Sequence, residues 1–138
     1  MTTKLLLAIP LLLVNACGGT RSDGYLHRGE ISVRIHDVPG LAGRWHPFTQ
    51  TVDLSWSRHR CTLAHELCHA ADSMGLPLQT VLTRLGNLSA QLGPEYALAV
   101  QVAQKASTLQ GSDTHWRALR DICGSWAVGH SDILARIK

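Results

Sequence analysis

The chain has 138 residues, of which 45% are hydrophobic and 17% are charged, and its formal net charge is +3 at pH 7. This length and composition fit one folded domain and exclude wholesale disorder. The weak, scattered positive charge argues against a nucleic-acid partner, and the lack of a Gly-rich phosphate loop excludes the usual nucleotide-binding motifs. Eight histidines stand against three glutamates, a ratio that favours metal chemistry.

The N-terminus predicts an export signal. Lys4 precedes an apolar run over residues 5–14, which is interrupted by Pro10. The run is shorter than the ~20 residues that a membrane-spanning helix needs, but it suits the hydrophobic region of a signal peptide. We therefore expect a signal peptide over residues 1–16. A start codon placed too early is the alternative interpretation of this segment.

The end of this segment resembles a bacterial lipobox, with Val14, Ala16 and Cys17 at the matching positions. Asn15 departs from the usual small residue. The resemblance implies cleavage before Cys17, a lipid on its thiol, and a flexible tether over residues 17–24. We expect an exported protein, lipid-anchored to a bacterial membrane on its periplasmic or extracellular face. An ordinary secretory signal, cleaved at the same bond, remains the alternative.

Strands come first in the folded domain expected over residues 25–138. Residues 31–35 alternate apolar and polar side chains, as do residues 51–56. Such alternation is typical of half-buried strands. Residues 39–50 contain two glycines and two prolines and are predicted to be loop. A short antiparallel sheet follows from these patterns.

Helices follow the strands. Ser57 can cap a helix over residues 58–74, and Gly75 can end it in the left-handed conformation. Further helical segments are predicted over residues 77–85, 94–109, 115–123 and after Ser131. Strands first and helices afterwards predict an α+β fold with a mostly helical C-terminal half.

Three cysteines follow the lipobox, and exported proteins permit disulfides. Cys61 and Cys68 lie on one predicted helix, ~10 Å apart along its axis, which is too far for a bridge between them. Cys123 can bridge to either one. Three buried thiols are the alternative.

The motif that carries chemistry is His-Glu-Leu-Cys-His over residues 65–69, an HExxH sequence. His65 and His69 are one helical turn apart, so both imidazoles project from one face. Two imidazole nitrogens can supply half of a tetrahedral Zn²⁺ site. Glu66 can accept a proton from a water that the metal activates. The alternative is an amphipathic helix whose histidines only face solvent or core.

HExxH on a helix after an alternating strand resembles the zincin superfamily of metallopeptidases. The resemblance covers about residues 50–75 of the chain. It implies a small zincin-like domain, zinc as cofactor, and hydrolysis of a peptide bond. It also implies that residues 51–56 form the sheet edge, where a substrate peptide pairs through its backbone.

The third metal ligand decides the subfamily. A metzincin needs His or Asp where this chain has Gly75, which excludes that class. Asp72, three residues after His69, resembles the HExxHxxD form of gluzincins. There the acidic residue supports the site and a distant glutamate binds zinc, which points to Glu95. An acidic residue in a first helical turn is also common for dipole reasons alone.

His115 is the other candidate. It is followed at once by Trp116 and an Arg-Ala-Leu run, and this segment resembles the third-ligand segment of SprT-like zincins. The glycine usual in that segment is missing here. We predict His115 as the third ligand of an open three-ligand site, with Glu95, Asp72 and Asp113 as alternatives.

Other side chains have weaker assignments. The oxyanion stabiliser is left open among Tyr96, Arg117 and His130. Four isolated histidines are interpreted as structural or exposed: His27, His36, His46 and His130. Four tryptophans are interpreted as core or cleft lining: Trp45, Trp56, Trp116 and Trp126.

The sequence thus predicts an exported zinc peptidase acting on a peptide or protein substrate. Two other classes stay open. One is a non-catalytic zinc-binding lipoprotein, and the other is a structural or interaction lipoprotein in which HExxH is accidental.

Overall fold

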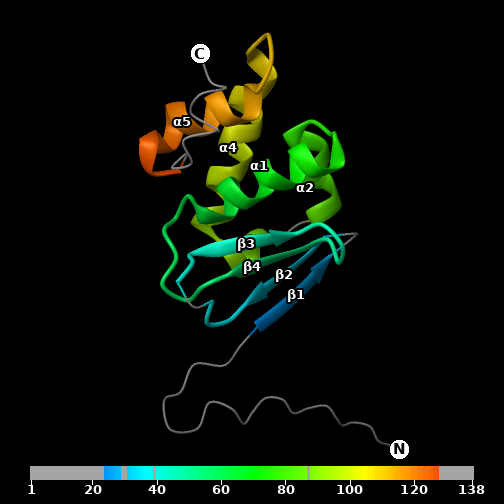
Figure 1. The fold of residues 1–138 in the computed structure, drawn as a ribbon, viewed down its shortest axis with the longest axis vertical. Coiled ribbons are helices and arrows are strands. Elements are labelled where there is room, and N and C mark those ends of the chain that lie inside the picture. Colours follow the sequence, from blue (N-terminus) through cyan, green and yellow to red (C-terminus); the bar gives the residue numbers. More distant parts are fainter. Residues whose placement is uncertain (1–23, 29–30, 39, 87, 128–138) are drawn as a thin grey trace, which may run out of the picture.

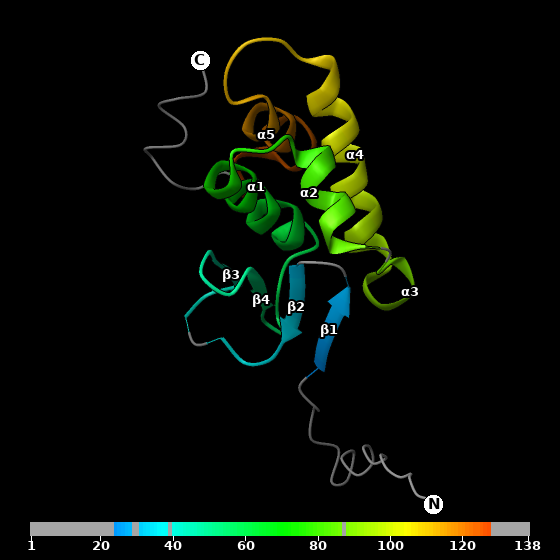
Figure 2. The ribbon, with the colours of Figure 1, turned by 90° about the vertical axis from the view of Figure 1, so that its right-hand side faces the viewer.

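The structure, a computed structural model, describes residues 24–28, 31–38, 40–86 and 88–127. The expected signal peptide, the lipidation site and the helix predicted after Ser131 lie outside these residues. In the described part the strands form one layer, and the helices gather on one side of it (Figures 1 and 2). No described helix is long and apolar enough to cross a membrane. The predicted α+β class is confirmed.

In the part of the chain that the structure describes, four strands form the sheet in the order β1-β2-β4-β3. Their bounds are β1 Gly24–Arg28, β2 Ile31–Ile35, β3 Gly43–His46 and β4 Thr51–Leu54. The β1–β2 and β3–β4 pairs are antiparallel, but β2 and β4 are parallel. The prediction of a short antiparallel sheet therefore holds for two of the three strand pairs and is wrong for β2 and β4, which are parallel. After β2 the chain crosses to the sheet edge, forms β3, and returns between β2 and β3 as β4.

Strand β3 lies inside the segment that was predicted to be loop. Its four residues, Gly-Arg-Trp-His, begin with glycine and are followed by Pro47, so they carry almost no strand signal of their own. The consequence is large, because β3 is the edge strand and β4 is interior. All four residues of β4 are buried. The prediction that residues 51–56 form the sheet edge is wrong.

Five helices follow within the described residues: α1 Thr62–Met74, α2 Leu78–Leu85, α3 Ser89–Leu92, α4 Pro94–Thr108 and α5 Thr114–Ala127. Helix α1 is central and contacts α2, α4, α5, β3 and β4. Gly75 ends it with φ +66°, as predicted. Pro94 is at the start of α4, also as predicted. Gly124 kinks α5 with φ +70°.

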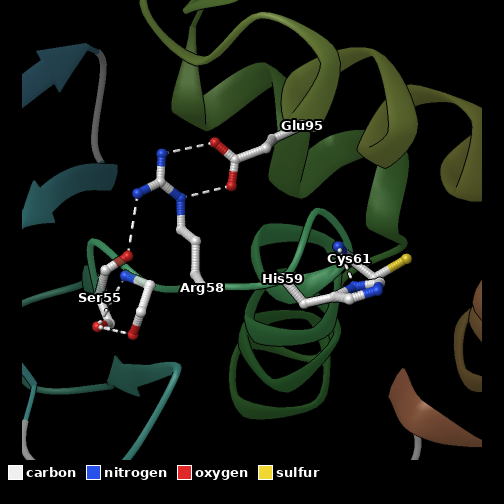
Figure 3. Close-up of polar contacts among 6 residues, drawn as sticks. Ser55, Arg58, His59, Cys61 and Glu95 are labelled. Carbon is white, nitrogen blue, oxygen red and sulfur yellow. Dashed lines mark hydrogen bonds and ion pairs between the residues drawn. The ribbon is translucent and has the colours of Figure 1, made fainter.

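Helix α1 starts later than predicted, and Ser57 is not its cap. Ser57 instead bonds Ser55, its hydroxyl lying 3.2 Å from the Ser55 hydroxyl. Arg58 holds the segment before α1 in place, donating to the Ser55 carbonyl and, through two guanidinium nitrogens, to the Glu95 carboxylate (Figure 3). These bonds attach the segment before α1 to helix α4, and α1 begins directly after Cys61.

The core lies between the sheet and the helices. Alternate residues of β2 and β4, such as Val33 and Val52, are fully buried there, as are Leu63 and Leu67 of α1. A disulfide joins Cys61 to Cys123, and Cys68 is a free, buried thiol. Of the pairings that the sequence left open, the structure therefore contains the one between the start of α1 and the far half of α5.

Candidate metal centre

Helix α1 brings the two histidines of the HExxH motif together. Their side chains share one helix face because they are four residues apart, and Nε2 of His65 lies 3.2 Å from Nε2 of His69. Two nitrogen ligands at ~2.1 Å from a tetrahedral zinc ion are ~3.4 Å apart. The separation of the two imidazole nitrogens fits two ligands of one ion.

Glu66 is buried beside them, with 7% of its surface exposed. Burial raises the pKa of Glu66 from its usual 4.5 to about 7, because the ionised form loses hydration. A hydrogen bond from the Trp45 backbone acts in the opposite direction and lowers this pKa. The motif's carboxylate is thus bonded to the edge strand and titrates near neutral pH.

Gly43 allows this close approach of β3 to α1. A Cβ atom at Gly43 would lie 2.8 Å from Thr62 Cγ2, 2.9 Å from the Asp53 backbone oxygen and 3.2 Å from Glu66 Cγ. Such contacts are too tight for any larger side chain at this backbone position. The glycine that made the segment look like loop is the residue that lets an edge strand pack on the motif helix.

A cleft of about 630 Å³ lies where β3 and the preceding loop face α1. It is lined by Leu41, Gly43, Arg44, Trp45, His65, Glu66, His69, Asp72 and Ser73. The three motif residues therefore open onto the same cleft as the edge strand. Sequence reasoning placed Trp45 in a core or cleft lining, but it missed Leu41, Gly43 and Arg44 because they fell in an apparent loop.

His115 is not grouped with the motif histidines. Its Nε2 lies 2.8 Å from Asp72 Oδ1. Among the residues that the structure describes, no three His, Cys, Asp or Glu side chains are arranged to hold a metal ion. His65, His69 and the Glu66 carboxylate lie on one cleft, and within the described residues no third metal-binding side chain is grouped with the two histidines.

Of the three alternative third ligands, Glu95 and Asp113 do not line the cleft and Asp72 does. Glu95 is bonded to Arg58 and lines a separate hollow. Asp113 precedes α5, where its carbonyl accepts the backbone N–H of Arg117, and it is not part of the cleft lining. Asp72 does line the cleft.

The residues considered for oxyanion stabilisation are also used elsewhere. The Tyr96 hydroxyl donates to the Gly86 carbonyl, and Arg117 Nη1 donates to the Gln110 carbonyl. Neither residue lines the cleft. His130 lies outside the described residues. Trp45, in contrast, lines the cleft and has a buried indole nitrogen without a hydrogen-bond partner in the described part of the chain.

Two histidines interpreted as isolated are joined through a buried aspartate. His36 Nε2 lies 3.1 Å from Asp53 Oδ1, and His46 Nε2 contacts Asp53 Oδ2. Asp53 alternates along β4 with Val52 and Leu54, which belong to the core. It therefore faces the side of the sheet away from the helices.

Comparison with protein-family models, with curated proteins and with solved structures gave no match for this chain. The case for a metal centre accordingly comes from the motif and from its geometry against β3 and α5.

Proposed function

We propose that this protein is an exported zinc-dependent peptidase in which His65 and His69 hold Zn²⁺ and Glu66 is the general base. The observation that carries the proposal is the 3.2 Å separation of the two imidazole Nε2 atoms on the cleft that Glu66 also lines. Two nitrogens at this separation can share a metal ion, and the neighbouring carboxylate has the place and the pKa of a proton acceptor.

The chemistry divides between the ion and the chain. Zinc, when bound, would polarise the scissile carbonyl and lower the pKa of the attacking water. Glu66 takes a proton from that water and later delivers it to the leaving amine. A carboxyl group whose pKa is about 7 can accept and return a proton near neutral pH. The Trp45 backbone holds the carboxylate toward β3.

The edge strand suggests how a peptide would lie. Strand β3 pairs with β4 along one side and lies at the edge of the sheet, and its Trp45 backbone is hydrogen-bonded to Glu66. An extended substrate could add beside β3 by backbone hydrogen bonds, as edge strands commonly allow. Leu41, which is 47% exposed, and Trp45 offer apolar contacts to its side chains.

His115 stays our predicted third ligand, and the geometry limits how it could act. Because its Nε2 is bonded to Asp72, Nδ1 would have to face the metal. A ligating histidine commonly gives its other ring nitrogen to a carboxylate. Asp72, Glu95 and Asp113 are the alternatives to be separated by experiment.

The compartment is part of the same proposal. The Cys61–Cys123 disulfide supports an oxidising environment, since such bonds are rare in the cytosol. We propose export by the N-terminal signal and anchoring through a lipid on Cys17.

The first experiment is zinc per mole of the purified full chain, measured for the parent and for His69→Ala, His115→Ala, Glu95→Ala and Asp72→Asn. One zinc in the parent, lost in His69→Ala and in one other variant, supports the site and identifies the third ligand. No zinc in the parent after reconstitution would overturn the proposal.

The second experiment separates an enzyme from a zinc-binding lipoprotein. Glu66→Gln should keep the zinc but lose about 10²–10⁴-fold in peptide hydrolysis, since it removes the general base. A parent that binds zinc and cleaves no peptide from a varied library would favour the non-catalytic class.

A further inference from the structure

Helix α5 supplies an aromatic ring beneath both motif histidines. Trp116 is fully buried. Its ring centroid lies 4.8 Å from that of His69 and 5.4 Å from that of His65, both in edge-on arrangements. Both imidazoles therefore pack against the Trp116 side chain, which comes from a distant part of the sequence.

That tryptophan is hydrogen-bonded to the helix that carries the histidines. Trp116 Nε1 donates to Asp72 Oδ2 over 2.7 Å, and His115 Nε2 lies 2.8 Å from Asp72 Oδ1. One carboxylate near the end of α1 therefore engages two consecutive residues of α5. The indole ring has little freedom to turn, because it is buried and its only polar atom is bonded.

The other half of α5 is tied to the beginning of α1. Cys61 immediately precedes α1, and its disulfide partner Cys123 lies seven residues after Trp116. Between these ties, the Cys68 thiol lies 3.7 Å from the His115 backbone oxygen. Helix α5 is thus attached to α1 near both of its ends.

We propose that Trp116, held by Asp72, is a positioning residue that keeps the two imidazoles together before metal binds. This inference rests on the proposed function. A buried ring packed against both imidazoles restricts their rotamers, so less ordering remains to be done when the ion arrives. Asp72 acts through Trp116, and its bond to His115 fixes the same turn of α5.

The test uses Co²⁺, which substitutes for zinc and has visible absorption bands that report coordination geometry. Full-length parent, Trp116→Leu, Trp116→Phe and Asp72→Asn are titrated with Co²⁺. Trp116→Leu removes the aromatic ring and should weaken binding by about 10–100-fold, with altered bands. Trp116→Phe keeps an aromatic ring without the N–H and should lose less.

The hydrogen bond is tested by a double-variant cycle. Because Trp116→Phe and Asp72→Asn disturb one bond, the double variant should weaken Co²⁺ binding by less than the product of the two single effects. Trp56→Phe is the matched control, since Trp56 lines a different hollow with Arg58 and Glu95. Circular dichroism confirms which variants are folded, and Trp116→Phe carries the test if Trp116→Leu is not.

Three results would overturn the inference. Unchanged Co²⁺ affinity in every folded Trp116 variant would show that the ring does not position the histidines. Loss of binding in Asp72→Asn, with Trp116→Phe like the parent, would make Asp72 a ligand instead. A parent that binds neither Co²⁺ nor Zn²⁺ overturns the proposed function, and this inference with it.

Discussion

The molecule contains two pairs of histidines on opposite sides of its sheet. In the first pair, His65 and His69 on α1 turn imidazole nitrogens toward each other at 3.2 Å. In the second, His46 Nε2 is hydrogen-bonded to Asp53, whereas His36 Nε2 lies 3.1 Å from the other carboxylate oxygen and forms no hydrogen bond within the described part of the chain. The first pair lines a cleft with its two nitrogens close to each other. The second pair lies on either side of one carboxylate.

The difference lies in what satisfies each pair. A carboxylate has two oxygens and can accept from two imidazoles at once. At Asp53 one oxygen is hydrogen-bonded to His46, and the other lies 3.1 Å from His36 Nε2. Two imidazole nitrogens facing each other can share one proton or one metal ion. The carboxylate of the motif itself, Glu66, is bonded to the β3 backbone. The two pairs thus differ in whether a carboxylate lies between the imidazole nitrogens.

The strongest test of this comparison replaces the histidines of each pair, one at a time, with alanine. His65→Ala or His69→Ala should weaken zinc binding by more than about 100-fold, because a ligand contributes more than the groups that orient it. His36→Ala and His46→Ala are the matched controls and should bind zinc like the parent. Zinc titration against a competing chelator measures all four. Equal losses in both pairs would contradict the distinction.

The next effect concerns Glu66 and pH in the metal-free protein. Because the folded pKa of about 7 is above the usual 4.5, the folded state holds this proton more tightly. The resulting stability is fully present below pH 4.5 and is lost as pH rises through 7. Between these values the parent should lose roughly 3 kcal/mol relative to Glu66→Gln.

Urea unfolding with a chelator present, repeated across this pH range, measures that difference. Parallel curves for the parent and Glu66→Gln would show that Glu66 does not titrate with a raised pKa.

Gly43 lies between the two clusters, near the Glu66 side chain and the Asp53 backbone. Gly43→Ala should destabilise the protein by about 1–3 kcal/mol, because its Cβ would overlap backbone that cannot move alone. Peptide hydrolysis should fall as well, since β3 must shift away from Glu66. Thermal unfolding and a peptide assay check the two effects. Gly40→Ala is the control for backbone strain. Gly40 has φ +72°, but a Cβ atom there would meet no other atom within 4 Å, so this variant adds strain without a close contact.

The smallest effect is expected from the second cluster. Asp53→Asn removes the charged partner of His46, which also lies within ion-pair distance of His36, and should cost about 1–2 kcal/mol. Zinc content and hydrolysis should stay at the parent's level. Urea unfolding measures the loss of stability. A loss of zinc in Asp53→Asn would mean that the two clusters are coupled through β3.

Much of this arrangement is local and can be predicted from the sequence. The spacing of His65 and His69 places both imidazoles on one helix face wherever the helix packs. Gly75 ends that helix because glycine adopts the left-handed conformation easily. Alternation over residues 31–35 and 51–56 predicts two strands, because side-chain direction in a strand has a period of two.

What surrounds the motif was decided by tertiary contacts. Strand β3 exists because β4 pairs with it and α1 covers it, and its four residues carry no periodic signal. Segments that are far apart in the chain meet in the disulfide between Cys61 and Cys123 and in the bond between Asp72 and Trp116. Glu66 is likewise buried against β3, which comes from an earlier part of the chain. Periodicity and spacing describe neighbours along the chain, whereas these contacts depend on how whole elements pack.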